Sequence, residues 1–338
     1  MKRLIWVSIL LTLAAVLLPL AFLSSPVEGA KAVVSPSPST SPAVPESAVP
    51  SPSPPPDYSM DGDFFFKVKF GEGDVRSVSM AEYLPNAVAA EMPVSFEPQA
   101  LRAQAVAART YIIYCTRHTN PKHPEANLCT DSGCCLAWLD ETELRAGWGE
   151  SFETNMALMD AACTETDGRM LVYDGAPILA TFHSSSAGFT EDGAELWGAV
   201  PYLTSVASPE TSEEVPNFVT TVEVAPENFR ESIKLLYPDT PFGEDPAGWL
   251  GGTELDGSGR VRKVEVCGVP LTGSEMRSLF ALRSTAFTLE YNGAAFVFTV
   301  TGYGHGLGLS QYGANAMAKI GSDYEEILAH YYPGATLK

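Results

Sequence analysis

The sequence has little positive charge. It contains 21 Lys and Arg residues against 41 Asp and Glu residues, which gives a formal net charge of -20 at pH 7. Proteins that bind nucleic acid or anionic lipid as their main partner present basic surfaces to phosphate groups. The charge balance therefore argues against nucleic acid as a partner, whereas an acidic protein can still bind neutral sugars.

Two familiar patterns are missing as well. Strand-like and helix-like segments are interspersed without a regular βαβ rhythm or a fixed repeat, which favours an α+β fold of mixed helices and antiparallel strands. The G-x-S-x-G motif of serine hydrolases is also absent. Ser184 or Ser185 as a nucleophile with His305 as its base therefore lacks the expected turn, and nothing marks the acid of a triad.

One long apolar run stands near the N-terminus. Residues 4–23 carry no charge and follow two basic residues, and such a run is long enough to cross a bilayer. The positive-inside rule then places the rest of the chain outside the cytoplasm. The alternative is a cleaved signal peptide, for which Gly29 and Ala30 offer small residues. We expect residues 1–30 to be a single-pass anchor in the cell membrane, and both alternatives imply export.

A Pro/Ser-rich stretch follows the apolar run. Residues 31–57 include "SPSPSTSPAVPESAVPSPSPPPD", a composition that cannot bury a core and favours an extended spacer. We expect a disordered linker there, which holds the rest of the chain away from the membrane. Residues 58–338 are then enough for one large domain or two interlocked ones.

Residues 58–338 contain both strand and helix signals. Strands are expected at residues 64–70 and 75–79, hairpins over 170–184 and 287–301, and helices at 80–90, 97–118, 272–282, 310–320 and 323–331. Local signals support these boundaries. Ser95 and Pro98 mark the start of the second helix, and "DGAP" and Asn292-Gly293 are the turns of the two hairpins. Capping boxes at Thr272 to Glu275 and at Ser322 to Glu325 mark the starts of two later helices. Together they predict an α+β domain, and we expect it to form a substrate cleft.

The stretch "AAEMPVSFEPQ" holds a single acid before its proline, Glu91. An acid in an amphipathic segment usually lies on the wet face, so a solvated surface residue is one interpretation. Pro93 stops the helix directly afterwards, and a carboxylate held at such a turn would lie at the rim of a cleft. The pattern leaves a surface acid and a cleft acid as alternatives.

Three ordered blocks carry a family resemblance. They are "EYLPNAVAAEMPVSFEPQALRAQAVAARTY", "FHSSSAGFTED...LWG...PYLTSV" and "GYGHGLGLSQYGANAMAKIGSDYEEILAHYYPG". From about Phe64 to the C-terminus the chain resembles the stage II sporulation protein D family, which also includes the amidase enhancer of cell-wall autolysins. The resemblance implies a peptidoglycan lytic transglycosylase that acts on glycan strands stripped of their stem peptides, with Glu91 as the catalytic group.

A single acid suits the implied reaction. An ordinary glycosidase uses two carboxylates, whereas a lytic transglycosylase needs one, because the C6 hydroxyl of muramic acid attacks C1 and closes a 1,6-anhydro ring. Glu91 would protonate the glycosidic oxygen and then accept the proton of that hydroxyl. It must begin protonated near neutral pH, and its apolar neighbours Ala90, Met92 and Phe96 would raise its pKa by desolvation.

Arg109 lies among alanines in "AVAARTYIIY", where a charge needs a partner. One interpretation is a buried structural ion pair, and the other is a residue that grips substrate or orients Glu91. The resemblance implies that an arginine at this position matters for activity. Because a cation in direct contact would lower the pKa of Glu91, we expect Arg109 to bind the lactyl carboxylate of the sugar instead.

The loop "KHPEANLCTDSGCC" holds a histidine and three cysteines. A disulfide is the usual state of cysteines in an exported protein, but vicinal Cys134 and Cys135 can hardly both pair locally without strain. Thiolates with an imidazole suit tetrahedral zinc. The resemblance implies a zinc set of His123, Cys129 and Cys135, with a fourth position open to water or another side chain. We expect this Zn2+ to be structural.

The glycines of "GYGHGLGLSQYG" allow tight turns and close approach to a ligand. The segment is either a packing turn or a wall of the sugar cleft, formed by His305, Ser310, Gln311 and Tyr312. Tyr202 in "PYLTSV" is a candidate to stack on a sugar ring. The family often has a lysine two residues later, and Thr204 in this chain argues against a cationic contact there.

The apolar run predicts export, and the resemblance implies an enzyme that cleaves the MurNAc-GlcNAc bond of peptide-stripped glycan strands and forms 1,6-anhydro-MurNAc. The resemblance also favours engulfment during sporulation as its setting, and a vegetative role is the alternative. Its partner would be an N-acetylmuramoyl-L-alanine amidase resembling stage II sporulation protein P, which removes the stem peptides first. The alternative is a non-catalytic cell-wall scaffold that recruits and activates an amidase.

Overall fold

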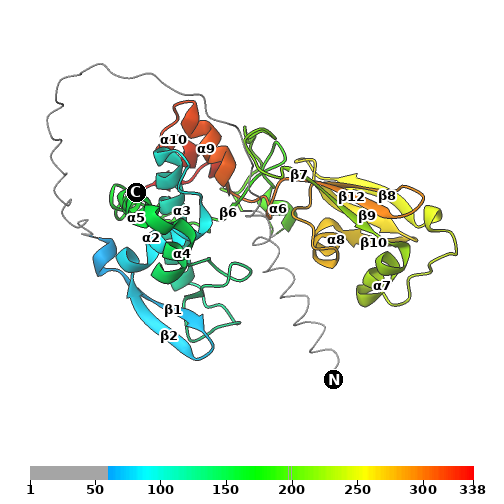
Figure 1. The fold of residues 1–338 in the computed structure, drawn as a ribbon, viewed down its shortest axis with the longest axis horizontal. Helices are drawn as coiled ribbons and strands as arrows, with labels where there is room; N and C mark the ends of the chain where they lie inside the picture. The colour runs from blue at the N-terminus through cyan, green and yellow to red at the C-terminus, as the bar shows by residue number, and fades with distance from the viewer. Residues whose placement is uncertain (1–59, 197, 199) are drawn as a thin grey trace, which may run out of the picture. The chain divides into compact units, whose positions relative to one another are not determined.

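The computed structural model describes residues 60–196, 198 and 200–338 (Figure 1). The predicted membrane anchor and Pro/Ser-rich linker lie outside these residues. Within the described ranges, no helix is both long and apolar enough to cross a membrane. This part of the chain contains two separate hydrophobic cores, one built mainly by helices and one mainly by antiparallel strands.

The first core, which we call the helical core, surrounds one long alanine-rich helix. Most residues of this helix from Ala100 to Ile112 are buried. Small alanine side chains let neighbouring elements approach its backbone on several sides. The central helix is α3 (Pro98–Thr116), and it packs against α2 (Met80–Glu91), α5 (Phe152–Thr164), α9 (Gln311–Lys319) and α10 (Tyr324–Tyr331) (Figure 1).

A small sheet leads into α2. Strands β1 (Phe65–Gly71) and β2 (Asp74–Ser79) form an antiparallel hairpin, and β3 (Leu128–Cys129) pairs with β1 in parallel. Ser79 accepts the N–H of Glu82, and the Glu82 carboxylate accepts the N–H of Ser79. This capping box sets where α2 begins.

Residues 219–301 contain the second core, and we call them the strand lobe. Phe229 stacks on Phe296 with ring centroids 4.0 Å apart, and Met276 is buried in the same core. One antiparallel sheet has the order β11 (Phe287–Tyr291), β12 (Phe296–Thr301), β7 (Val219–Val224), and the other β10 (Val269–Thr272), β9 (Val261–Val266), β8 (Leu250–Leu255). The helices of the lobe are α7 (Pro226–Leu236) and α8 (Gly273–Leu279).

The chain segments on either side of the strand lobe pair with each other. Strand β6 (Phe182–His183) pairs in parallel with β13 (Leu309–Ser310), and Ser185 forms an antiparallel bridge with Tyr303. Gly308 permits this approach, because a Cβ there would lie 2.0 Å from the Thr181 carbonyl oxygen. The second and third sequence blocks are thereby joined.

The remaining elements are short. β5 pairs with β4, and β4 pairs with β14 near the C-terminus. These elements are η2 (Asp61–Asp63), α4 (Glu141–Trp148), η3 (Gly149–Ser151), β4 (Leu171–Tyr173), β5 (Ala176–Pro177), α6 (Gly193–Leu196), η4 (Pro246–Gly248) and β14 (Thr336–Leu337).

The mixture of helices and antiparallel strands confirms the α+β prediction. The hairpin over 287–301 turns at Asn292-Gly293, and α8 begins at the predicted Thr272 to Glu275 capping box. Local turn and capping chemistry was sufficient to predict these elements, because the residues that decide each boundary are near neighbours in sequence.

Three boundary predictions were wrong. The hairpin over 170–184 exists only as β4 and β5, because the following residues pair with β13 instead. Helix α3 is preceded by Glu97 rather than capped by Ser95, and Glu97 makes no side-chain cap. Helix α10 uses a capping box of Asp323 and Glu326, one residue later than predicted.

Candidate active site

Helix α2 places Glu91 at the edge of a cleft. Glu91 is the last residue of the helix, after which Met92 caps it through its N–H on the Val88 carbonyl. The Glu91 side chain is half-buried, and its Oε1 accepts the backbone N–H of Ala137 at 3.1 Å. The cleft has a volume of about 690 Å³. This position matches the cleft alternative rather than the solvated surface acid.

The cleft takes its lining from the helical core, the cysteine loop, the β6 and β13 region and the strand lobe. Among these described lining residues, Glu91 is the only carboxylate. The lining consists of Ala90, Glu91, Tyr111, Ser132, Gly133, Cys134, Cys135, Ala137, Thr181, Phe182, His183, Ser184, Arg277, Tyr303, Gly304, His305 and Gln311.

Burial raises the pKa of Glu91 above that of an ordinary glutamate. The backbone N–H of Ala137 and the side chain of Gln311 act in the opposite direction, because both stabilise the charged carboxylate. Burial is the larger effect. Glu91 therefore keeps its proton to a higher pH than an exposed glutamate does.

Gln311 is the first residue of α9, and its side chain is buried. Its carboxamide lies near enough to Glu91 to favour the charged form of that acid. Even so, Nε2 has no hydrogen-bond partner of normal geometry in the described part of the chain. The structure thus brings a spare N–H donor to the side of the acid.

His305 stands on a tight turn between two glycines with positive φ angles, 117° at Gly304 and 88° at Gly306. Its Nδ1 accepts the N–H of Leu307 at 3.0 Å, so the ring proton lies on Nε2. Burial and the nearby Arg277 lower the pKa of His305 to about 4. The ring lines the cleft as a neutral group at neutral pH.

Arg109 does not line the cleft. Its guanidinium is fully buried and forms an ion pair with Asp61, with Nη2 2.7 Å from Oδ2. Nη1 donates to Thr166 and to the Arg169 carbonyl, and Nη2 also donates to the Cys163 carbonyl. The expectation that Arg109 binds a sugar carboxylate is therefore corrected: the side chain forms the buried ion pair that the sequence left open.

Three further candidates also lie outside the cleft lining. The Tyr202 hydroxyl accepts the N–H of Leu179 at 3.1 Å. Ser310 is buried, caps α9 and donates to the Glu210 carboxylate. The Tyr312 ring packs edge-on against Phe96. In this arrangement their polar groups and rings serve packing, so only Glu91, His305 and Gln311 of the predicted sugar-site residues share the cleft.

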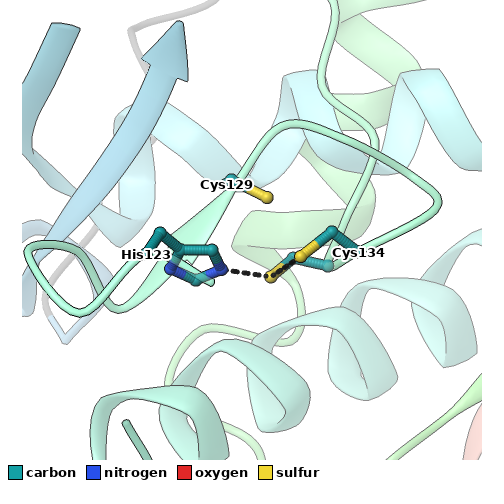
Figure 2. A group of neighbouring side chains, drawn as sticks. His123, Cys129 and Cys134 are labelled. Atoms are coloured by element: carbon teal, nitrogen blue, oxygen red, sulfur yellow. Dashed lines mark hydrogen bonds between the residues drawn. The ribbon is translucent and has the colours of Figure 1, made fainter. Parts of the chain in front are cut away.

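The cysteine loop brings four potential metal ligands together. His123 precedes β3, Cys129 ends it, and Cys134 and Cys135 follow. Figure 2 shows the side chains of His123, Cys129 and Cys134 gathered together. The ligand atoms all lie within 4.8 Å of one another. Tetrahedral zinc with bonds of about 2.0 to 2.3 Å places its ligand atoms about 3.5 to 3.8 Å apart. The observed cluster therefore has the size and chemistry that a zinc ion needs.

Cys134 joins the set in addition to the three predicted ligands. The His123 Nε2 lies 3.1 Å from the Cys135 sulfur, and the two vicinal sulfurs are 3.9 Å apart. No disulfide links the described cysteines. The sequence left the fourth position open to water or another side chain, and the structure favours a side chain, because the Cys134 sulfur completes a Cys3His set.

Neighbouring groups orient these ligands. The His123 Nδ1 faces the Ala126 carbonyl at 3.2 Å, which leaves Nε2 to face the sulfurs. The Asn120 side chain donates toward Cys134 and Cys135 at 3.6 and 3.8 Å. Such outer contacts fix ligand geometry and stabilise thiolates, as they do around known metal sites.

The cleft also contains residues that the sequence analysis missed. Tyr111 lies two positions after Arg109, inside the first sequence block, so its position offered a signal. Arg277 comes from α8 of the strand lobe, and Tyr303 follows the lobe directly. Arg277 carries only a local helix signal, and nothing in the sequence connects it with Glu91.

Known proteins are similar to this chain over regions that include the blocks described above. A profile of the family described as "SpoIID: Stage II sporulation protein" matches residues 71–173, which include Glu91 and the cysteine loop. The amidase enhancer of Bacillus subtilis (strain 168) is 29% identical over 299 residues, covering 73% of this chain and 39% of that protein.

Two relatives are similar over most of the chain. Stage II sporulation protein D of Bacillus subtilis (strain 168) is 33% identical over 277 residues, covering 78% of this chain and 75% of that protein. Stage II sporulation protein D of Bacillus amyloliquefaciens is 34% identical over 265 residues with the same coverage. With this identity and coverage, the chain belongs to the stage II sporulation protein D family.

Proposed function

We propose that this protein is a peptidoglycan lytic transglycosylase that acts at the cell wall during sporulation, with Glu91 as its single acid and base. The observation that carries the proposal is that Glu91 is the sole carboxylate among the described residues of the cleft lining. A hydrolase with two catalytic carboxylates would place a second one within about 5 to 10 Å. One acid suffices only if the substrate supplies its own nucleophile.

In the first step, protonated Glu91 donates its proton to the glycosidic oxygen between MurNAc and GlcNAc, and the bond from C1 to that oxygen breaks. The C6 hydroxyl of the same MurNAc attacks C1, and the Glu91 carboxylate accepts its proton. The ring closes as 1,6-anhydro-MurNAc, and Glu91 regains its proton for the next cycle. The reaction consumes no water.

The neighbours of Glu91 suit both halves of this cycle. Burial favours the protonated form of the acid before the first transfer, because it raises the pKa. The Ala137 N–H and the spare Nε2–H of Gln311 stabilise the carboxylate that exists between the two transfers. His305, neutral and held by Leu307, contacts the sugar without competing for the proton.

The Cys3His cluster fits a structural role next to this chemistry. His123, Cys129, Cys134 and Cys135 would hold Zn2+, and a bound ion with four protein ligands holds the loop together and leaves no position for a reactive water. The loop matters because Cys134 and Cys135 line the cleft and Ala137 holds Glu91. Its fold therefore sets the surroundings of the acid.

The cellular setting is a further part of the proposal. We propose that residues 1–30 anchor the protein in the cell membrane and that residues 31–57 hold the catalytic part in the wall. An N-acetylmuramoyl-L-alanine amidase resembling stage II sporulation protein P would remove stem peptides before cleavage. One similar protein is named an amidase enhancer, which favours a scaffold that activates an amidase as the second candidate function.

Product chemistry tests the proposal. The fragment from Asp57 onward, incubated with peptide-free glycan strands, should produce anhydro-muramic ends detectable by mass spectrometry, and Glu91→Gln should abolish them. A Glu97→Gln variant is the matched control, because Glu97 lies outside the cleft lining. Reducing ends in place of anhydro ends would indicate a hydrolase. Binding without cleavage, together with faster cutting by an added amidase, would support the scaffold.

A further inference from the structure

Arg277 is the one guanidinium among the described residues that line the cleft. It lies on α8 of the strand lobe and is half-buried. Its Nε donates to the Leu282 carbonyl at 3.2 Å, which holds the side chain in place. Within the described part of the chain, Arg277 forms no ion pair with a carboxylate, in contrast to the buried Arg109.

A half-buried arginine without a carboxylate is unusual, because desolvation of its charge is offset only by partners. Burial accordingly lowers the pKa of Arg277. Two more guanidiniums lie nearby. Arg260 is near Arg277 but forms an ion pair with Glu191, and Arg283 lies over the Tyr303 ring at 4.3 Å. An anion that entered the cleft would satisfy the charge that the protein leaves unpaired.

The presence of Arg277 in the cleft is compatible with a raised pKa of Glu91. Burial, Ala137 and Gln311 are the influences on the pKa of Glu91, whereas Arg277 acts on the pKa of His305. Arg277 is therefore not among the groups that shift the pKa of Glu91 toward the charged form. With Glu91 protonated, the cleft carries local positive charge in a protein whose net charge is -20.

We propose that Arg277 is the specificity-determining residue that binds the free lactyl carboxylate of muramic acid. This inference rests on the proposed function. In a glycan strand without stem peptides, the lactyl group is the anionic group of each MurNAc, and it is attached to the ring whose C1 bond is cut. A guanidinium pairs with a carboxylate through two parallel hydrogen bonds, which adds orientation to attraction.

The assignment predicts a preference for stripped strands. A stem peptide joined to the lactyl group converts its carboxylate to a neutral amide, which cannot pair with Arg277. The peptide also needs space on that side of the cleft. The residue that distinguishes stripped from intact strands is then in the strand lobe, while the acid is in the helical core.

Binding measurements in a Glu91→Gln background test this role without requiring cleavage. Short stripped strands with free lactyl carboxylates are compared, by calorimetry, with the same strands after conversion of the carboxylates to methyl amides. The free-carboxylate strands should bind about tenfold more tightly, which is the usual contribution of a charge-assisted hydrogen bond. Added Arg277→Gln should remove the difference, and Arg277→Lys should retain part of it.

The matched control is Arg230→Gln, which removes the same charge from the exposed face of α7 in the same lobe. It should keep the tenfold preference. Thermal unfolding checks that each variant folds, and Arg277→Lys provides a second route if Arg277→Gln does not. Equal affinities for the two kinds of strand, failure of either to bind, or a preference that survives Arg277→Gln would each overturn the inference.

These outcomes are separate from the test of the proposed function. Absence of anhydro ends with intact Glu91 would contradict the transglycosylase, yet the carboxylate preference would still report on Arg277. Anhydro ends with no carboxylate preference would leave the enzyme in place and remove Arg277 from recognition.

Discussion

Asp61 and Arg109 are 48 residues apart in sequence and form one buried ion pair. The Arg109 Nε lies 2.9 Å from both carboxylate oxygens, and each partner exposes only a few per cent of its side chain. The pair joins η2, at the start of the described chain, to the central helix α3. An arginine in the first sequence block therefore stabilises the fold that presents Glu91, rather than touching the substrate.

Loss of Arg109 should destabilise the fold strongly. Arg109→Met leaves the Asp61 carboxylate buried without its partner, and breaking such a pair costs about 3 to 5 kcal/mol. Urea denaturation of the fragment from Asp57 onward measures this free energy of unfolding. The control is Arg102→Met, which breaks a more exposed pair with Glu165 and should cost less than about 1 kcal/mol. If Arg109→Met kept its stability but lost cleavage, Arg109 would instead be assigned to substrate binding.

The residues that the sequence could predict are those whose neighbours in sequence decide their structure. Asn292-Gly293 turns a hairpin, Thr272 caps a helix, and Glu91 ends one before Pro93. Where two local signals overlap, the sequence does not show which one is used. The stretch "SDYEE" contains two possible capping boxes, and helix α10 begins with the one at Asp323.

Contacts between residues far apart in the chain could not be predicted from the sequence. The role of Arg109 depends on Asp61, and the place of Arg277 in the cleft depends on how the strand lobe is joined through β6 and β13. Neither relationship produces a periodic pattern or a local motif in the sequence. The cysteine loop is intermediate: its short spacing predicted a metal set, but whether vicinal Cys134 also faces the cluster depends on the loop geometry.

Removal of the Gln311 side chain should shift the pH profile of cleavage. The proposed reaction needs protonated Glu91, so the rate should fall as pH rises through the raised pKa of that acid. Gln311 lowers this pKa by stabilising the carboxylate. Gln311→Leu should therefore raise it further and move the alkaline limb to higher pH, while the maximal rate falls because the carboxylate between the two proton transfers loses a donor.

Initial rates measured over a range of pH check this shift. Gln99→Leu is the control, because Gln99 accepts the N–H of Tyr324 and lies outside the cleft lining. It should leave the alkaline limb where it is. A limb that moves to lower pH in Gln311→Leu, or does not move, would contradict the assigned contact between Gln311 and Glu91.

Cys134 should behave as a metal ligand. The fragment purified without chelator should carry about one zinc per chain by elemental analysis. Cys134→Ser and Cys129→Ser should each lower both the zinc content and the melting temperature, because metal binding contributes to the stability of the loop. Cys267→Ser, in the strand lobe, should change neither. Full zinc content and an unchanged melting temperature in Cys134→Ser would restore the three-ligand set.

Gly308→Ala should separate β6 from β13. A Cβ at Gly308 would lie 2.0 Å from the Thr181 carbonyl oxygen, so the backbone must move, at a cost of about 3 kcal/mol. Gly293→Ala is the control: it also has a positive φ, but no atom lies within 4 Å of its added Cβ, and its strain should cost about 1 kcal/mol. Denaturant unfolding compares the two variants, and equal costs would argue against the close approach.

The strand lobe enters and leaves the rest of the fold at one place. The N–H of Gly302 donates to the Phe218 carbonyl at 2.8 Å, and the core of the lobe shares no residue with the helical core. Segments whose ends lie together are tolerated as insertions. A single contiguous stretch of the gene, codons 219 to 301, can therefore be exchanged between relatives through two adjacent junctions. If Arg277 and Glu91 have the roles proposed above, natural recombination or a laboratory chimera would in this way change which glycan strands bind while Glu91 is inherited unchanged.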